Sequence, residues 1–244
     1  DDTKPTATFE NGEYIIYVRR DVGKSYDREI ARCVTTDLCF WDRNCTRILH
    51  TDSQDPPNLD VYTNSYTNYY GKHMLFPSMY YHFGPKNPYG FENDGLLDIR
   101  FLVSDDSLNW QYAANDRSPY VYLGNNLCTN GNKPSLHGGW CPLSELSTTS
   151  TTMSAMYMAS GFVLSKDGQY IYQYISGQPF THGSDGTKKQ WKQNSAIIRL
   201  RNRRDGFTYI QAPYVFNDPL PFLLTKPVTV PSKSCRLLVN MQTS

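Results

Sequence analysis

The sequence predicts an all-β fold of the β-propeller type, because one strand-and-turn pattern recurs along the chain. The run at 96–110, LLDIRFLVSDDSLNW, is an apolar strand followed by a serine, an acid two positions later and a tryptophan four beyond that; the run at 28–41, REIARCVTTDLCFW, repeats this order with threonine for serine. Weaker copies lie at 162–172 and 203–210. Each copy fits a hairpin whose acid or hydroxyl group caps the turn. Hairpins repeated at about a blade length are typical of a propeller, and unrelated hairpins in another all-β fold are the alternative.

The remaining elements agree with this class when they are taken in order. Two strands at 6–9 and 14–20 are joined through Asn-Gly, the favoured tight hairpin turn. The further expected strands are at 30–34, 62–66, 73–83, 120–123, 156–164, 170–176, 195–200, 207–211 and 237–240. Between them lie turn-rich connectors and a long loop that ends at Pro142. No stretch longer than two turns has a helical period, so no long helix is expected.

Composition narrows the classes of function. The chain of 244 residues can bury a sizeable core, and its 19 tyrosines suit either carbohydrate stacking and interfaces or ordinary strand formation. The net charge of +1 and a single basic run at 199–204, RLRNRR, predict no nucleic-acid partner; the run is expected to protect a strand edge. No apolar run is long enough to cross a bilayer. The start lacks a signal-peptide pattern, so we expect a mature or truncated product.

The cysteines and one sequon indicate an exported protein. Six cysteines contain no C-x-x-C pair, so no zinc site is expected. Disulfides that close the loops 39–45 and 128–141 are the simplest pairing, although other connectivities and free thiols stay open. Asn44 begins an N-x-T sequon and is the candidate glycosylation site. We therefore expect a secreted, disulfide-bonded glycoprotein.

Several short motifs together resemble a known family. They are the D-T-x-x-x-x-x-F-x-x-G-x-Y-x-x-Y-x-R run at 2–19, YTNS at 62–65, LFPSMYYH at 75–82, DIRFLVSDD at 98–106, the R-x-R-R-D-G-F-T-Y-I-Q-A run at 201–212 and the closing LLVNMQTS. With these residues the chain resembles uncharacterised relatives of the glycoside hydrolase family 32 N-terminal domain, a five-bladed propeller of the invertase and arabinanase clan. The resemblance implies carbohydrate as the ligand. It implies no required cofactor, although it would allow a calcium ion in the central channel if Asp side chains lined it.

Two departures from that family limit what the resemblance implies. The invertase signatures, a W-M-N-D-P-N-G-like opening, R-D-P and E-C, are missing, so no fructan specificity is implied. The start also resembles a middle blade. We therefore expect propeller blades over 1–236, incomplete at the N-terminus, and the start of a β-sandwich or a closing strand at 237–244. Other chains that complete the propeller or form an extracellular assembly are candidate partners.

Glycoside cleavage requires two carboxyl groups, one acting as acid and the other as nucleophile or base. Asp2 opens a strand and Asp98 precedes the central turn, so both are expected to reach one channel. Glu145 is a third catalytic candidate, near the Gly-Gly-Trp loop; the position after that tryptophan, where relatives often have an acid, is Cys141. A solvated strand start for Asp2, a salt bridge to Arg100 for Asp98 and a solvated loop position for Glu145 are the alternatives.

The candidate substrate-binding residues are cationic or aromatic side chains, which can hold sugar hydroxyls or stack on sugar rings. They are Arg20, Arg28, Tyr62, His82, Trp140 and His182. Ordinary structural roles are the alternative for each of them. The sequence thus predicts an exported, glycoside hydrolase-like propeller that binds carbohydrate and, if active, hydrolyses a glycosidic bond. The alternative is a catalytically inactive propeller used for glycan binding or for assembly.

Overall fold

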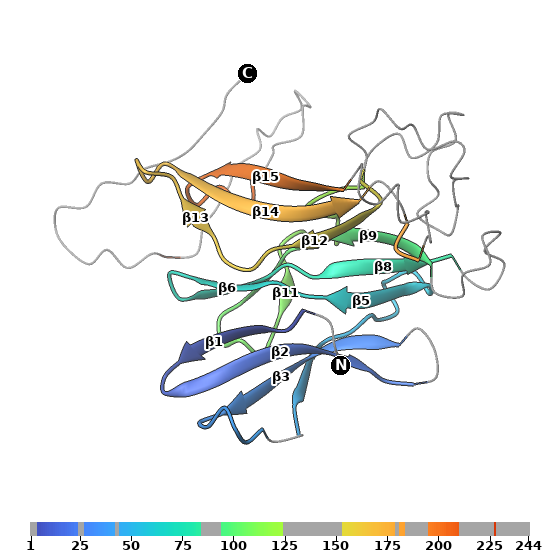
Figure 1. Ribbon diagram of the computed structural model, residues 1–244, viewed down its shortest axis with the longest axis horizontal. Helices are drawn as coiled ribbons and strands as arrows, with labels where there is room; N and C mark the ends of the chain where they lie inside the picture. The colour runs from blue at the N-terminus through green and yellow to red at the C-terminus, as the bar shows by residue number, and fades with distance from the viewer. Residues whose placement is uncertain are drawn as a thin grey trace. The chain divides into compact units, whose positions relative to one another are not determined.

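A computed structural model describes residues 4–23, 27–41, 44–83, 94–123, 153–178, 181–183, 195–209 and 227 of the chain (Figure 1). Every regular element in those ranges is a β-strand. The strands are β1 (Thr6–Glu10), β2 (Glu13–Asp21), β3 (Arg28–Thr35), β4 (Thr46–Leu49), β5 (Leu59–Thr63), β6 (Tyr66–Tyr69), β7 (Lys72–Leu75), β8 (Ser78–His82), β9 (Gly95–Ile99), β10 (Leu102–Ser104), β11 (Gln111–Tyr112), β12 (Ala155–Met158), β13 (Val163–Leu164), β14 (Tyr170–Gln178) and β15 (Ala196–Arg203). All of them belong to one compact unit, Asp1–Phe207, and the second unit is Thr208–Ser244. The expected strand at 237–240 lies outside the described residues.

Within the described ranges the strands form three sheets. The first has the order β1-β2-β3-β4 and the second β11-β10-β7-β6. The third runs β13-β14-β12-β9-β8-β5, with β15 also paired to β14. Neighbouring strands are antiparallel except for β9 and β12, which pair in parallel at Leu97 and Ala155. The largely antiparallel pairing agrees with the hairpins that the repeated turns predicted, and only the first sheet consists of consecutive strands throughout.

The repeated turn has the same hydrogen bonds in both of its strong copies. The backbone N–H of Asp106 donates to the Ser104 hydroxyl at 3.2 Å, and that of Asp37 donates to the Thr35 hydroxyl at 3.1 Å. Each aspartate then accepts a backbone N–H two residues further on, at 2.9 and 2.8 Å. The tryptophan of each copy closes the turn by donating its indole N–H to the carbonyl three residues earlier. The expected capping role of these two acids is confirmed.

The hairpin between β1 and β2 follows from its Asn-Gly turn. Asn11 and Gly12 both have positive φ, 52° and 84°, the backbone that a type I′ turn requires and that these two residues tolerate. The turn sets a register in which Glu10 faces Glu13 and Thr6 faces Tyr17. Alternation along β2 then buries Ile15, Tyr17 and Arg19 on one side of the sheet.

The third sheet is packed on both of its faces, and this positions the candidate site. Side chains alternate along each strand, so neighbouring residues face opposite sides. One face carries Val61, Met79, Tyr81 and Leu96, which belong to the largest hydrophobic cluster. The other face carries a separate cluster of Tyr62, Tyr80, Leu97 and Ala155, with Tyr157 packed against it. Trp110 packs beside Tyr17 of the first sheet, with the ring centroids 6.2 Å apart.

The disulfide differs from the expected pairing. Cys45 is bonded to Cys33, and Cys39 is free and exposed, so the prediction that Cys39 pairs with Cys45 is wrong. The register explains the difference, because Arg32, next to Cys33 on β3, pairs with Thr46, next to Cys45 at the start of β4. The disulfide therefore fastens two adjacent strands instead of closing the tryptophan turn. The expected pair Cys128 and Cys141 lies outside the described residues.

Candidate functional site

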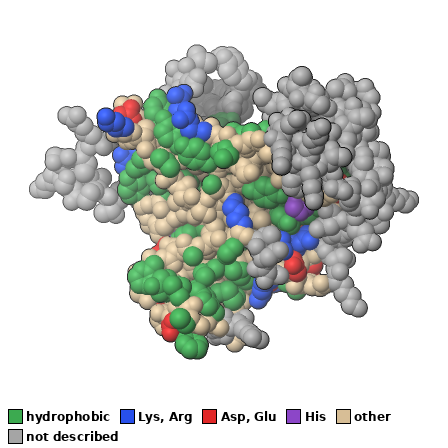
Figure 2. Space-filling view, viewed as in Figure 1, with side chains coloured by type: hydrophobic (Ala, Val, Ile, Leu, Met, Phe, Trp, Pro, Cys, Tyr) green, Lys and Arg blue, Asp and Glu red, His purple; other side chains and the backbone are tan. Residues whose placement is uncertain are grey.

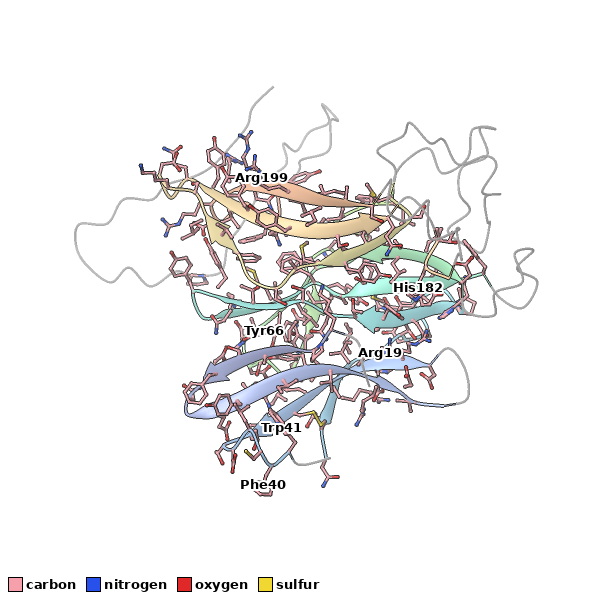
Figure 3. The ribbon with its side chains drawn as sticks, viewed as in Figure 1. Arg19, Phe40, Trp41, Tyr66, His182 and Arg199 are labelled. Carbon is pink, nitrogen blue, oxygen red and sulfur yellow. A yellow bond between two sulfur atoms is a disulfide. The ribbon has the colours of Figure 1, made fainter. Side chains whose placement is uncertain are left out.

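Four of the six predicted substrate-binding residues lie together over one face of the third sheet: two are on its strands β5 and β8, one is at the start of β3 in the first sheet, and one is in a segment outside the strands. They are Arg28, Tyr62, His82 and His182. Together with Arg19, Asp60, Tyr80, Asp94 and Tyr157 they form what we call the His182 cluster. Figure 3 labels Arg19 and His182 at the ends of β2 and β8, on the same side of the sheets. Figure 2 shows one histidine side chain at the surface beside Lys or Arg and acidic side chains.

Strand alternation and one bulge bring the aromatic side chains together. Tyr80 and His82 are two positions apart on β8, and Asp60 and Tyr62 are two apart on β5, so each pair shares a face. Asp60 lies directly opposite Tyr80, and the register shifts between Val61 and Thr63. Bulges of this kind re-aim a side chain. Here Tyr62 reaches Tyr80 with the ring centroids 5.3 Å apart.

Three tyrosine rings surround the His182 imidazole. The ring centroids of Tyr62, Tyr80 and Tyr157 lie 4.6, 5.0 and 6.4 Å from that of His182. The Tyr157 hydroxyl is 2.8 Å from Nδ1 of His182. Burial, reinforced by the positive charge of Arg28, lowers the pKa of His182 to about 4. The imidazole is therefore neutral at pH 7, with one nitrogen able to donate a hydrogen bond and the other able to accept one.

Asp60 is a buried carboxylate that binds the side chains of Arg28 and His82. Its side chain is 1% exposed. It accepts hydrogen bonds from the backbone N–H of Arg28 at 2.9 Å and from the Arg28 guanidinium at 3.2 Å. The Nε2 of His82 lies 2.8 Å from the same carboxylate. The guanidinium of Arg28 is thereby held over the rings of Tyr62 and Tyr80, at 5.4 and 5.7 Å from their centroids.

Asp94 anchors the segment that carries His182. It accepts hydrogen bonds from the Thr181 hydroxyl at 2.9 Å and from the backbone N–H of Gly183 at 2.8 Å. The backbone N–H of His182 donates to the carbonyl of Gly95 at 2.9 Å. Residue 95 must be glycine here, because a Cβ would lie 2.0 Å from the backbone oxygen of Tyr81. The close approach of two strands and a loop thus fixes the imidazole.

Asp98 does not join the cluster. It pairs with Met79 in the ladder and so lies on the face opposite to Tyr80. Its side chain is buried, accepts a hydrogen bond from the Tyr81 hydroxyl at 2.9 Å and forms a salt bridge with Arg100 at 3.2 Å. Burial raises the pKa of Asp98 against the opposing charge of Arg100. The structure therefore contains the salt bridge that was the alternative to a catalytic role.

The other predicted site residues are apart from the cluster or outside the described residues. Arg20 faces away from Arg19 on β2, forms an ion pair with Glu29 and donates to the carbonyl of Cys45. Asn44 is exposed, as a glycosylation acceptor must be. The remaining three, Asp2, Glu145 and Trp140, lie outside the described residues, so the expected pairing of Asp2 with Asp98 stays a prediction.

Five members of the cluster were not among the predicted site residues: Arg19, Asp60, Tyr80, Asp94 and Tyr157. A signal for Asp60 is present in the sequence, because it is a lone charge inside the strand run LDVYT and stands two positions before Tyr62. Tyr80 and His82 repeat this aromatic and polar spacing on β8. No local pattern singles out Tyr157, which joins the cluster only through the parallel pairing of β9 with β12.

Two further expectations concern metal ions and membranes. Among the described residues, no group of three or more His, Cys, Asp or Glu side chains is arranged to hold a metal ion. The same part of the chain has no helix that is long and apolar enough to span a membrane.

Comparisons with known proteins identify the fold. No family model and no curated protein matches the sequence. Among solved structures, the chain is similar to Zg3597, a family 117 glycoside hydrolase of the marine bacterium Zobellia galactanivorans, with a TM-score of 0.50 and 14% identity over 82% of this chain and 51% of that chain. It is also similar to CoXyl43, a GH43 β-xylosidase/α-arabinofuranosidase from a compost microbial metagenome, with a TM-score of 0.43 and 14% identity over 83% and 55% of the two chains.

The match to the family 117 structure confirms the predicted fold class. The chain has, in part, the fold of the five-bladed propeller glycoside hydrolases. It spans about half the length of the two solved structures that it matches. The finer resemblance to relatives of family 32 stays a prediction.

Proposed function

We propose that the chain is part of an exported, glycoside hydrolase-like propeller that binds carbohydrate at the His182 cluster. The observation that carries the proposal is that Arg28, Tyr62, His82 and His182, chosen from sequence as sugar-binding residues, lie within one network of ring contacts and hydrogen bonds.

The chemistry of the cluster suits a neutral sugar. A sugar presents hydroxyl groups that both donate and accept hydrogen bonds, and C–H faces that pack on aromatic rings. Tyr157 and the neutral His182 are half-buried, and their hydrogen bond of 2.8 Å uses Nδ1 of the imidazole, so Nε2 is the imidazole atom that can bind a sugar hydroxyl. Asp60 neutralises Arg28, which favours an uncharged ligand over an anion.

Export is part of the proposal and has two supports. The disulfide between Cys33 and Cys45 fits an oxidising compartment. Asn44, next to that disulfide in the sequence, is exposed and begins the sequon. Expression in a secretory eukaryotic host with and without Asn44→Gln tests this part. A mass shift that the variant abolishes would support glycosylation, and equal masses would contradict it.

Hydrolysis is the second candidate function, and the hydrolase fold is the observation that favours it. Within the cluster, Asp60 and Asp94 are buried and hydrogen-bonded, as Asp98 is on the opposite face. The described carboxylates therefore suit a binding role better, and catalysis would depend on Asp2, Glu145 or another part of the protein. Release of reducing ends from each bound oligosaccharide separates the two functions.

An array of neutral oligosaccharides, followed by calorimetric titration of each hit, tests the proposal. His182→Gln should weaken binding about tenfold or more, because it removes the imidazole from the ring of tyrosines. The matched control is His73→Gln, since His73 makes the same kind of contact with a tyrosine, Tyr66, at 2.7 Å in the second sheet. Equal affinities for His182→Gln and the wild type, or no hit on the array, would refute the proposed site.

A further inference from the structure

The basic run at 199–204 lies outside the His182 cluster and contains exposed arginines. Residues 199, 201 and 203 are exposed arginines that alternate along β15 with inward-facing Ile198, Leu200 and Asn202. Ile198 and Leu200 pack in a hydrophobic cluster with Ile175 of β14. The arginines therefore share the outer face of the β14–β15 hairpin. Figure 3 labels Arg199 on this hairpin.

Tyrosines of β14 lie beneath these arginines. Tyr170, Tyr172 and Tyr174 alternate with the buried Ile171, Gln173 and Ile175, so they share the outer face. The guanidinium of Arg199 lies 4.9 Å from the ring centroid of Tyr172, and that of Arg201 lies 4.9 Å from the ring centroid of Tyr170. We call these five residues, Tyr170, Tyr172, Tyr174, Arg199 and Arg201, the Tyr–Arg ladder.

The ladder presents positive charge that the described residues do not neutralise. In those ranges, no carboxylate lies within ion-pair distance of Arg199 or Arg201, whereas Arg19, Arg20 and Arg28 each have an acidic partner. Stacking on tyrosine uses the face of a guanidinium and leaves its N–H edge free to bind an anion in a bidentate manner. Along a strand, alternate side chains are about 6.7 Å apart, so the ladder offers regularly spaced anion sites.

We propose that the Tyr–Arg ladder binds an acidic polysaccharide, through the carboxylate or sulfate groups along its chain. Charge complementarity selects a polyanion, and the tyrosine hydroxyls beside each guanidinium can bind sugar hydroxyls. This surface is distinct from the His182 cluster, whose Arg28 is neutralised by Asp60. The inference does not rest on the proposed function.

A nucleic acid fits the ladder less well. Sequence-independent binding of single strands relies on open aromatic faces for base stacking. Here one face of Tyr170 and one face of Tyr172 are covered by arginine. An acidic polysaccharide, by contrast, needs only the guanidinium edges and hydroxyl groups that remain accessible.

Titrations with polygalacturonate, dextran sulfate and neutral dextran test the proposal, and the first two distinguish carboxylate from sulfate. The full chain should bind at least one of the two polyanions and not neutral dextran. Arg199→Gln with Arg201→Gln should weaken that binding about tenfold or more, because two charge-assisted contacts are lost. The control pair, Arg47→Gln with Lys72→Gln, removes the same charge from other exposed positions and should change affinity less than about twofold.

Each remaining outcome overturns the proposal. These outcomes are no binding of either polyanion, equal weakening by the two variant pairs, and tighter binding of a single-stranded oligothymidylate that the ladder pair abolishes. Urea midpoints show that the variants are folded, which is expected because all four substituted side chains are exposed. His182→Gln should leave polyanion binding unchanged, so failure of the proposed neutral-sugar site is distinguishable from failure of this one.

Discussion

Asp60 is the residue on which the geometry of the His182 cluster depends most, and its removal gives the sharpest prediction. Its carboxylate accepts three hydrogen bonds: from the backbone N–H of Arg28, from the Arg28 guanidinium and from His82. The Asp60 side chain is 1% exposed, and those of Arg28 and His82 are 15% and 3% exposed. Water can therefore replace few of these contacts.

The magnitude follows from counting donors and acceptors in Asp60→Asn. The amide keeps one acceptor oxygen and places an NH₂ group where the second oxygen was. His82 can adapt by changing tautomer, but a guanidinium has no acceptor, so one charge-assisted hydrogen bond is lost. Such a bond is worth about 1.5 to 3 kcal/mol, and the partial exposure of Arg28 favours the lower end. Asp60→Ala leaves both partners without the carboxylate and should cost about 3 to 5 kcal/mol.

Equilibrium urea unfolding measures both values. A double-mutant cycle of Asp60→Asn with His82→Gln isolates the pair, and a coupling energy of about 1 to 2 kcal/mol is expected for groups in one network. Both single variants should keep the wild-type m-value, since the surface exposed on unfolding does not change. Additive effects together with losses below about 0.5 kcal/mol would refute the reasoning that Asp60 holds the cluster.

Three further predictions test other parts of the structure. Replacing both Cys33 and Cys45 by alanine should destabilise the fold by about 3 kcal/mol, because the disulfide closes a loop of 12 residues. Cys39→Ser should change stability by less than about 0.5 kcal/mol, because this thiol is free and exposed. Equal effects of the two changes on urea unfolding would contradict the observed pairing. Gly95→Ala should cost more than about 3 kcal/mol of stability or prevent folding, because the added Cβ would overlap the backbone of Tyr81. Gly12→Ala should cost about 1 kcal/mol, because position 12 has open space but a positive φ. Thermal melts that rank the two variants in reverse order would be inconsistent with the close approach of Gly95 to Tyr81. The pKa of His182 is lowered from 6.5 to about 4, so between these pH values the unfolded chain binds more protons than the folded chain, and the neutral imidazole's contribution to stability is complete above about pH 6.5 and lost as the pH falls toward 4. Urea midpoints of His182→Gln should lack this part of the pH dependence. Parallel curves of midpoint against pH for the variant and the wild type would argue against it.

The sequence was most informative where local chemistry decides the structure. Alternation of period two, the Asn-Gly turn at 11–12 and the acid and tryptophan of the repeated turn each depend on neighbouring residues, and the all-β class follows from them. The choice of aromatic and cationic residues for the site also depends on side-chain chemistry alone. It placed four residues in what became the His182 cluster.

The sequence was least informative where register decides. Asp60 in LDVYT and Asp98 in LLDIRF are both single acids in apolar strands, and the only local difference is Arg100, two positions after Asp98. The pairing of β5, β8 and β9 places Asp60 beside Tyr80 and Asp98 beside Met79, on opposite faces. The disulfide has the same explanation, because the alignment of β3 with β4 brings Cys33, not Cys39, to Cys45.

The most direct test of carbohydrate binding at the His182 cluster is a crystal structure of the chain soaked with an oligosaccharide identified on the array. We expect sugar density against the half-buried side chains of the His182 cluster, with sugar hydroxyls within about 3.2 Å of Tyr157 Oη or of the His182 imidazole. Density for the neutral sugar at another surface, such as the Tyr–Arg ladder, with the cluster unchanged, would contradict it.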